Sequence, residues 1–365
     1  MSDTRSSDST LRAAWRRIAW RQRLATLCGK PGLLPVLASL RRMLGRDLRI
    51  LAYHRVRDVD PDTFDFDLNL ISASSAQFRE QMQLVRKYFD PVSFRDVVSA
   101  LDGGPALPAK PLVVTFDDGY DDNYAVAFPI LREQGVPATF FVSTGHIDSG
   151  APYEYDWLVH MFCRAGAGAR LHVPELGIDE VLPDQIDERR RMAGELLFGL
   201  KGLDAAVQTA VIARLEVDWG LPRPATHPDS RPMTWDQLRE MHAAGMEIGS
   251  HGVAHRILAK LSKEEMAAEV RESKRVLDRE LGVPALSLSY PVGGLDAYDD
   301  EVIATARDAG FRVACNYIAG TNRWPSSPSH ALHRLSVERE MDMGWFAAMT
   351  LLPEVFAYRK RLRTA

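Results

Sequence analysis

The stretch 111-PLVVTFDDGYDD-122 gives the main indication of the fold. Its first six residues form an apolar run typical of a buried strand, and four aspartates follow: Asp117, Asp118, Asp121 and Asp122. Adjacent carboxylates at the end of a buried strand repel each other and lose hydration, which costs free energy unless a cation relieves them. The stretch therefore predicts a strand whose carboxyl end opens into a polar site.

Similar short apolar runs recur along the chain and alternate with helical patterns. The runs that predict further strands are 48–53, 138–143, 246–250, 285–290 and 311–316. Helices between them are marked by capping signals, such as Ser74 or Ser75, Thr234, and Ser262 with Glu265. This alternation predicts a parallel sheet, open or closed into a barrel. Residues from about 148 to 231 show helical patterns without a clear strand and predict a helical insertion.

Length and charge limit the possible classes of protein. The 365 residues suit one α/β barrel or two modest domains. The net charge is −4, but residues 1–49 hold eleven Lys/Arg against three Asp. We expect a basic helical arm over 1–47, with possible peripheral contact to an anionic membrane. The body is acidic and the arm lacks a recognised motif, so we expect no nucleic-acid partner.

The start of the chain lacks the apolar core of a signal peptide, and no window of about 18 apolar residues occurs anywhere. We therefore expect no transmembrane helix. The expected location is cytoplasmic, possibly peripheral at the inner membrane.

Polar residues follow the predicted strands at the points where the strands end. They are His54, the pair Asp117 and Asp118, the pair His251 and His255, and Tyr290 with Pro291. In parallel α/β folds the carboxyl ends of the strands carry the working residues. Two histidines and one carboxylate form a three-ligand metal site with positions left for water, and the second carboxylate can take a proton from that water. Each motif is weak alone, because H-x-x-x-H arises by chance and Asp-Asp-Gly is often a turn.

The ordered motifs "TFDDGYDDNY", "EIGSHGVAH" and "SYPVGG" resemble those of the polysaccharide deacetylases, the NodB-homology carbohydrate esterases. "ILAYHRV", "FVSTG", "MTWDQLREM" and "LHRLSV" resemble the branch linked to exopolysaccharide synthesis. The resemblance covers about 48–340 and implies a distorted (β/α)7-type barrel, followed by a helical tail over 341–365. It also implies hydrolysis of acetyl groups from sugars with a divalent metal, zinc first, cobalt or nickel as alternatives.

Carried over by motif, the resemblance makes Asp117 the general base and Asp118, His251 and His255 the metal ligands. A backbone N–H near Tyr290, before Pro291, is expected to hold the oxyanion. Asp121 and Asp122 are expected to cap the next helix.

This sequence departs from the family pattern at two points. Ser289 stands where many members have an arginine that orients the base, so Asp117 is expected to lack that partner. The proton donor for the leaving amine is open between His333, in "ALHRLSV", and His54, in "YHRV". In the branch linked to exopolysaccharide synthesis, the residue usually found in the motif of His333 is an arginine, which here is the neighbouring Arg334.

Three functions remain in view. The first is deacetylation of an N-acetylated exopolysaccharide or its lipid-linked precursor. The second is deacetylation of peptidoglycan or chitin-type oligomers, which normally requires export. The third is a catalytically reduced protein that binds acetylated glycan, which the missing arginine and the unassigned acid keep open.

Overall fold

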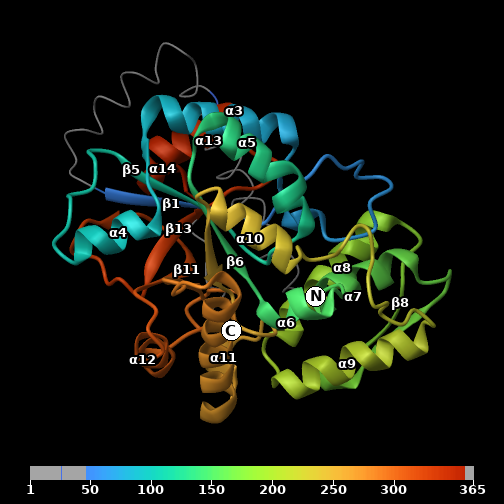
Figure 1. Ribbon diagram of the computed structural model, residues 1–365. Helices are drawn as coiled ribbons and strands as arrows, with labels where there is room; N and C mark the ends of the chain where they lie inside the picture. The colour runs from blue at the N-terminus through green and yellow to red at the C-terminus, as the bar shows by residue number, and fades with distance from the viewer. Residues whose placement is uncertain (1–25, 27–46, 358–365) are drawn as a thin grey trace, which may run out of the picture.

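The computed structural model describes Thr26 and residues 47–357, and a closed barrel of seven parallel strands lies at its centre (Figure 1). Around the ring the strands are β1 (Asp47–Tyr53), β13 (Leu332–Ser336), β11 (Val313–Ala319), β10 (Ser287–Ser289), β9 (Glu247–Ser250), β6 (Ala138–Val142) and β5 (Pro111–Phe116). Pairing of β1 with β5, from Arg49 opposite Leu112 to Tyr53 opposite Phe116, closes the ring. The predicted seven-stranded barrel is confirmed.

Six of the seven barrel strands follow the apolar runs seen in the sequence. The seventh, β13, was not predicted as a strand, because His333 and Arg334 interrupt its apolar pattern. Arg334 is nevertheless 1% exposed, since its charge is paired inside the barrel. A buried ion pair therefore concealed the strand from a reading based on hydrophobicity.

Short strands extend the barrel and helices surround it. The short strands are β4 (Asp90–Pro91) beside β5, β12 (Asn322–Arg323) antiparallel to β1, and the pair β2 (Arg55–Val56) and β3 (Ile71–Ala73). The surrounding helices are α3 (Ser75–Tyr88), α4 (Phe94–Leu101), α5 (Phe128–Gln134), α6 (Thr144–Ser149), α10 (Trp235–Ala243), α11 (Lys263–Leu281), α12 (Asp300–Asp308), α13 (Met343–Leu351) and α14 (Pro353–Phe356). Single turns are η2 (Leu68–Leu70), the π-helical η3 (Asn123–Ala127) and η5 (Leu258–Lys260).

The helix starts follow the capping signals in the sequence. Ser74, Thr234 and Ser262 each form a capping box with the residue at the third helical position, which satisfies backbone donors that would otherwise lack a partner. Helix α11 ends at Gly282, which adopts the left-handed conformation that glycine tolerates best. These local signals fix where the helices begin, while packing on the barrel supplies most of their stability.

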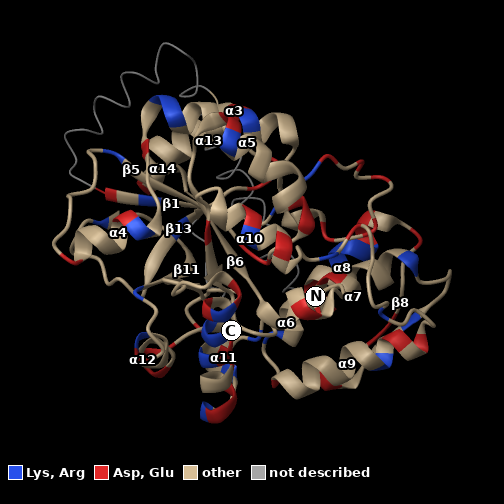
Figure 2. Ribbon diagram, viewed as in Figure 1, with Lys and Arg blue, Asp and Glu red and all other residues tan. Residues whose placement is uncertain are grey.

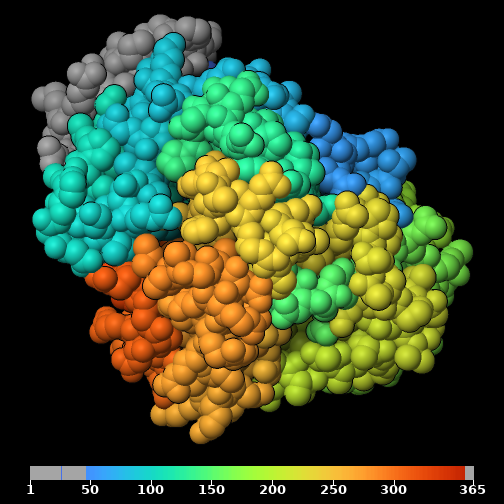
Figure 3. All heavy atoms as spheres, in the orientation of Figure 1, coloured from blue at the N-terminus to red at the C-terminus, as the bar shows by residue number. Residues whose placement is uncertain are grey.

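The segment predicted as a purely helical insertion also contains a β-hairpin. Its elements are α7 (Glu154–Arg164), β7 (Arg170–Val173), η4 (Pro174–Leu176), β8 (Ile178–Val181), α8 (Ile186–Leu200) and α9 (Ala205–Asp218). The hairpin was missed because its second strand is largely exposed and therefore polar. The insertion forms a lobe beside the barrel, yellow-green in Figure 3, with a hydrophobic cluster that includes Trp157, Phe162 and Leu196.

The expected basic arm over 1–47 lies almost entirely outside the described residues. Of the expected tail, 341–365, the structure describes α13 and α14, and α13 packs into the main core through Trp345, Phe346 and Met349. Among the described residues, no helix is both long enough and apolar enough to span a bilayer.

Candidate functional site

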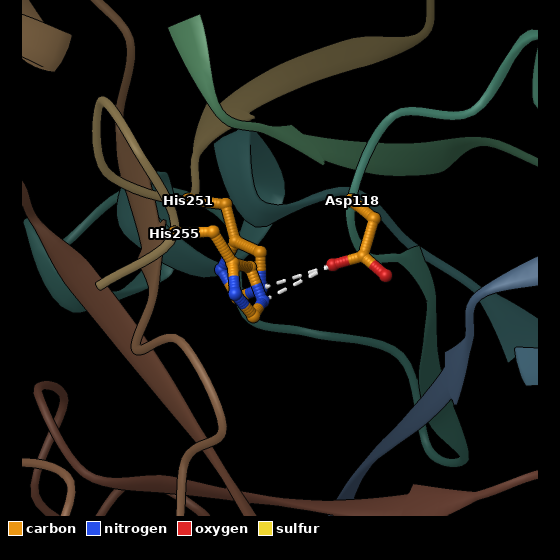
Figure 4. A group of neighbouring side chains, drawn as sticks. All are labelled: Asp118, His251 and His255. Carbon is orange, nitrogen blue, oxygen red and sulfur yellow. Dashed lines mark ion pairs between the residues drawn. The ribbon is translucent and has the colours of Figure 1, made fainter. Parts of the chain in front are cut away.

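Three side chains that could bind a metal meet at the carboxyl ends of β5 and β9. Asp118 Oδ1 lies 3.3 Å from Nε2 of His255 and 3.6 Å from Nε2 of His251. One ligand atom from each residue lies within 4.8 Å of the others, and the three side chains point toward one another (Figure 4). The structure therefore brings together all three residues to which the resemblance assigned the metal.

Left-handed backbone at two of these residues aims their side chains inward. Asp118 has φ 72° and His255 has φ 56°, which are uncommon for residues other than glycine. Gly119 follows with φ 79°, where a Cβ atom would lie 2.8 Å from the side chain of Val142. Such strained conformations persist only where surrounding contacts stabilise them, and they are common at functional sites.

The two histidines meet through a loop, not through the helical turn considered from their spacing. Residues 251–255 are non-helical, and Glu269 of α11 accepts the N–H groups of Val253 at 2.7 Å and Ala254 at 3.0 Å. This buried carboxylate ties the loop to the helix behind it. His255 thus reaches the site because the loop is anchored there.

The donor set suits a divalent metal such as zinc. Asp118 Oδ1 is buried and has no hydrogen-bond partner among the described residues. Nδ1 of His251 lies 2.7 Å from the carbonyl oxygen of Ser289, which orients the ring and leaves Nε2 for a ligand. Burial lowers the pKa of His251 to about 4, so the imidazole is in the neutral form that metals bind.

The same carboxylate is held ionised by its neighbours. Burial alone would raise the pKa of Asp118, but the nearby imidazoles, His255 first, outweigh burial and hold that pKa well below its ordinary value. A buried, ionised carboxylate oxygen that makes no hydrogen bond to the described residues and faces two imidazole nitrogens is the arrangement expected where a cation binds.

Asp117 has an arginine partner, contrary to the expectation from Ser289. Nη1 and Nη2 of Arg334 donate to the two carboxylate oxygens at 2.8 and 2.7 Å. Arg334 Nη2 also donates to the Ser289 hydroxyl at 2.9 Å, so the serine helps to hold an arginine that comes from another strand. Burial would raise the pKa of Asp117, but the guanidinium outweighs it and lowers that pKa.

The two candidate acids occupy different places. His54 follows β1 and lines the same cavity as Asp117 and Asp118. Its backbone is fixed, because its N–H donates to Ser72 at 2.9 Å and its carbonyl accepts from Asn123 at 2.8 Å. His333 is absent from the described residues that line the cavity, and its Nδ1 lies 3.2 Å from Oδ1 of Asn316. Of these two histidines, the structure brings only His54 to the cavity that Asp117 and Asp118 line.

The backbone N–H groups at and after Tyr290, where the oxyanion donor is expected, differ in their hydrogen bonds. The Tyr290 N–H donates to the backbone carbonyl of Cys315 at 3.0 Å. The Tyr290 hydroxyl donates to the backbone carbonyl of His330 at 2.9 Å. Pro291 has no N–H. Val292 lines the cavity with φ 63°, and its N–H donates to no acceptor among the described residues.

The insertion contributes to the candidate metal site through Tyr153. The Tyr153 hydroxyl donates to the backbone carbonyl of Asp118 at 2.6 Å, and its ring lies edge-on to His255, with centroids 5.6 Å apart. Tyr155 packs beside the same histidine at 4.9 Å. No motif in the sequence indicated these tyrosines, because their role depends on how the insertion folds back over the barrel.

Asp121 and Asp122 do not cap the following helix as expected. Asp122 makes no side-chain cap and instead forms a buried ion pair with Arg55, Nε to Oδ2 2.8 Å. Asp121 pairs with Arg231 at 2.5 Å, at the end of the insertion. Both carboxylates therefore fasten neighbouring segments around the site.

A cavity of about 780 Å³ gathers these groups, a size typical of small-molecule sites. One wall comes from the barrel and includes His54, Tyr317 and Glu338. Another wall comes from α8 and α9 and includes Leu197, Gln208 and Ile212.

The chain was compared with known protein families. The model for the family described as polysaccharide deacetylase matches residues 104–314, more than half of the chain.

The chain belongs to the polysaccharide deacetylase family. The resemblance inferred from the motifs is thereby confirmed.

Two relatives show how similar the chain is to individual proteins. The protein YxkH of Bacillus subtilis is 22% identical over 244 residues, covering 66% of this chain and 56% of that one. The poly-beta-1,6-N-acetyl-D-glucosamine N-deacetylase of Escherichia coli is 33% identical over 102 residues, covering 28% of this chain and 14% of that one. The chain thus spans little more than half, or less, of the length of these relatives.

A solved structure agrees with the fold of the family. The Streptococcus pyogenes deacetylase PplD, in complex with acetate, superposes with a TM-score of 0.56 at 20% identity. The match covers 86% of this chain and 100% of that one, which supports the shared barrel.

Proposed function

We propose that this chain hydrolyses N-acetyl groups from the sugars of a bacterial exopolysaccharide or of its lipid-linked precursor. The observation that carries the proposal is the division of labour between neighbouring aspartates. Asp118 faces two histidines, while Asp117 is held by Arg334 beside them. Family membership supports a deacetylase, and the Escherichia coli relative is by name an enzyme of N-acetylglucosamine polymers.

Asp118, His251 and His255 would hold the metal. A divalent ion bound there would supply the Lewis acidity that polarises an amide carbonyl and lowers the pKa of a water molecule. Asp117 accepts the proton of the attacking water. Each of its oxygens takes one hydrogen bond from Arg334, and a carboxylate oxygen can accept two, so capacity for the water remains.

The remaining roles fall to the barrel wall. The Val292 N–H, preorganised by its left-handed backbone, donates to the oxyanion that develops on the carbonyl. His54 gives a proton to the leaving nitrogen, since it lines the cavity and its backbone is fixed on both sides. A free amine on the sugar and acetate are the products.

Two arguments favour a catalytically reduced binding protein, the missing arginine and the unassigned acid, and the pairing of Arg334 with Asp117 weakens the first. The experiment that tests the proposal is acetate release from N-acetylglucosamine oligomers by the purified, metal-loaded protein. Asp117→Asn is expected to keep the metal and to lose at least a hundredfold in kcat, because the base is removed while the ligands stay. An Asp117→Asn variant as active as the wild type would disprove the assignment of the base.

A further inference from the structure

A second cavity adjoins the catalytic one along helix α8. It has a volume of about 520 Å³ and shares Asp67 and Asn69 with the catalytic cavity. Its main wall is the outer face of α8, where Arg190, Gly194 and Phe198 follow one another at four-residue spacing. The two cavities therefore adjoin, and the path from the candidate metal site onto the insertion runs across these shared residues.

Phe198 is the aromatic residue on this path. Its side chain is 71% exposed, and among the described residues it is the one aromatic among the exposed large hydrophobic side chains. Phe198 lies on a helix whose other face packs into the core of the insertion through Met192, Leu196 and Leu200. Packing among the described residues therefore does not account for Phe198, whereas an aromatic face is a good platform for the apolar face of a pyranose ring.

Gly194 lies one turn before Phe198 and keeps the path open. A glycine in the middle of a helix costs about 1 kcal/mol relative to alanine. Neither conformation nor crowding requires it here, because its φ is not left-handed and an added Cβ would meet nothing within 4 Å. What the glycine provides is open space on the outer face of the helix, one turn before Phe198.

Polar groups with fixed positions line the same path. Arg190 Nη2 donates to the backbone carbonyls of Phe64 at 2.6 Å and Pro61 at 2.8 Å, which holds the guanidinium in place. Arg191 and Glu195 pair at 2.8 Å on the adjacent ridge. Both signs of charge are thus present near α8 (Figure 2), as suits the hydroxyl and amide groups of a sugar better than a highly charged ligand.

We infer that the outer face of α8, with Gly194 and Phe198 at its centre, is an accessory subsite for a sugar of the same glycan chain whose acetyl group is removed in the catalytic cavity. The inference rests on the proposed function and extends it. It assigns the insertion a role in binding an oligosaccharide several units long, rather than a single sugar.

The test compares a dimer and a pentamer of N-acetylglucosamine as substrates of the metal-loaded protein. Phe198→Ala removes the platform, and Gly194→Leu fills the space while favouring the helix. Both are expected to lower kcat/KM for the pentamer about tenfold, and to leave the dimer unchanged, because half-burial of a phenyl ring is worth about that factor. Val217→Ala, at an 80% exposed position of α9 outside both cavities, is the control and should match the wild type.

Equal effects on dimer and pentamer, or no effect on either, would overturn the subsite. Calorimetric titration of the pentamer into Asp117→Asn, with and without Phe198→Ala, separates this inference from the proposed function. If the wild type releases no acetate but Phe198→Ala still weakens pentamer binding about tenfold, the proposed function fails and the subsite stands. If pentamer affinity is equal in both proteins, the subsite fails whatever the activity.

Discussion

The guanidinium of Arg334 holds both carboxylate oxygens of Asp117 from a strand 217 residues further along the chain. The pair is 1% and 3% exposed at its two side chains, so each charge would be costly without the other. The pairing keeps Asp117 ionised and fixes its orientation. It also makes the carboxylate a weaker base than an unpaired one, so position and a constant supply of the ionised form compensate for basicity.

Replacing Arg334 is expected to move the pH dependence of the reaction. In Arg334→Gln the burial of Asp117 is no longer outweighed, so the pKa of the carboxyl rises and the acidic limb of the kcat/KM profile shifts to higher pH. Loss of the partner should also destabilise the fold by about 3–5 kcal/mol at neutral pH. Kinetic pH profiles and chemical denaturation measure the two effects.

The neighbouring His333→Ala is the matched control for that experiment. His333 lies on the same strand, is bonded to Asn316 and is outside the cavity lining. Its pH profile should follow the wild type. A kcat/KM profile of Arg334→Gln that superposes on that of the wild type would show that Arg334 does not set the pKa of Asp117.

Metal content should separate the two adjacent aspartates. Purified protein is expected to retain about one divalent ion, and Asp118→Asn or His251→Ala should release it, because each removes one of three ligands. Asp117→Asn should retain the ion. Elemental analysis after gel filtration measures this directly, and metal retained at the wild-type level by both ligand variants would refute the site.

The hydroxyl of Tyr153 is expected to matter for metal affinity. Tyr153→Phe removes the 2.6 Å bond to the Asp118 carbonyl, which helps to hold the left-handed backbone of that ligand. Loss of such a supporting bond typically weakens metal binding by about 10–100-fold. Competition with a fluorescent chelator gives the affinity.

Tyr155→Phe provides the comparison for Tyr153→Phe. Tyr155 is also packed against His255, but its buried hydroxyl has no partner among the described residues. Its removal should leave metal affinity at the wild-type value. Equal losses in both variants would mean that ring packing, and not the bond to Asp118, sets the affinity.

The strained backbone at Val292 predicts the effect of a glycine. Left-handed conformations cost a β-branched residue about 1–3 kcal/mol, which Val292→Gly would relieve while keeping the N–H in place. We expect thermal stability equal to or above that of the wild type and little change in kcat. A melting temperature several degrees lower would show that the valine side chain stabilises the loop by more than the strain it introduces.

Asp156 should make stability depend on pH. It is fully buried at the base of the insertion, where it accepts a hydrogen bond from Ser230, and burial raises its pKa to about 6. The pKa of Asp156 in the folded protein thus lies above the ordinary value of about 4. Protonated Asp156 therefore stabilises the folded state fully below about pH 4, and this contribution to the free energy of unfolding is lost as pH rises through about 6.

Asp156→Asn, which stays neutral, should therefore gain stability relative to the wild type above pH 6, by up to about 2–3 kcal/mol. Denaturation at pH 4.5 and pH 8 measures the difference. The exposed Asp184 of the same insertion gives the control substitution, Asp184→Asn. A constant offset between Asp156→Asn and the wild type would contradict the account.

Local patterns in the sequence carried the barrel and the convergence of the three candidate ligands, because parallel strands bring their carboxyl ends together. These local patterns do not predict contacts that depend on strand register. His333 and Arg334 are adjacent, and side chains that follow one another on a strand point to opposite faces. A shift of the strand pairing by one residue would therefore place His333 inside the barrel in place of Arg334. The Val292 N–H was also missed, since a backbone donor gives no signal in residue type. The left-handed turn that exposes it was visible only as a proline followed two residues later by glycine.

The insertion leaves the barrel after α6 and returns before α10, and there Trp235 Nε1 donates to Asp148 Oδ1 at 2.7 Å. Its point of departure and its point of return therefore adjoin. A segment attached in this way can lengthen, shorten or be exchanged by recombination without altering the register of the strands beside it. The barrel strands that carry Asp117, Asp118 and the two histidines can then be inherited unchanged while the outer part of the insertion evolves, provided that the contact of Tyr153 with Asp118 is kept.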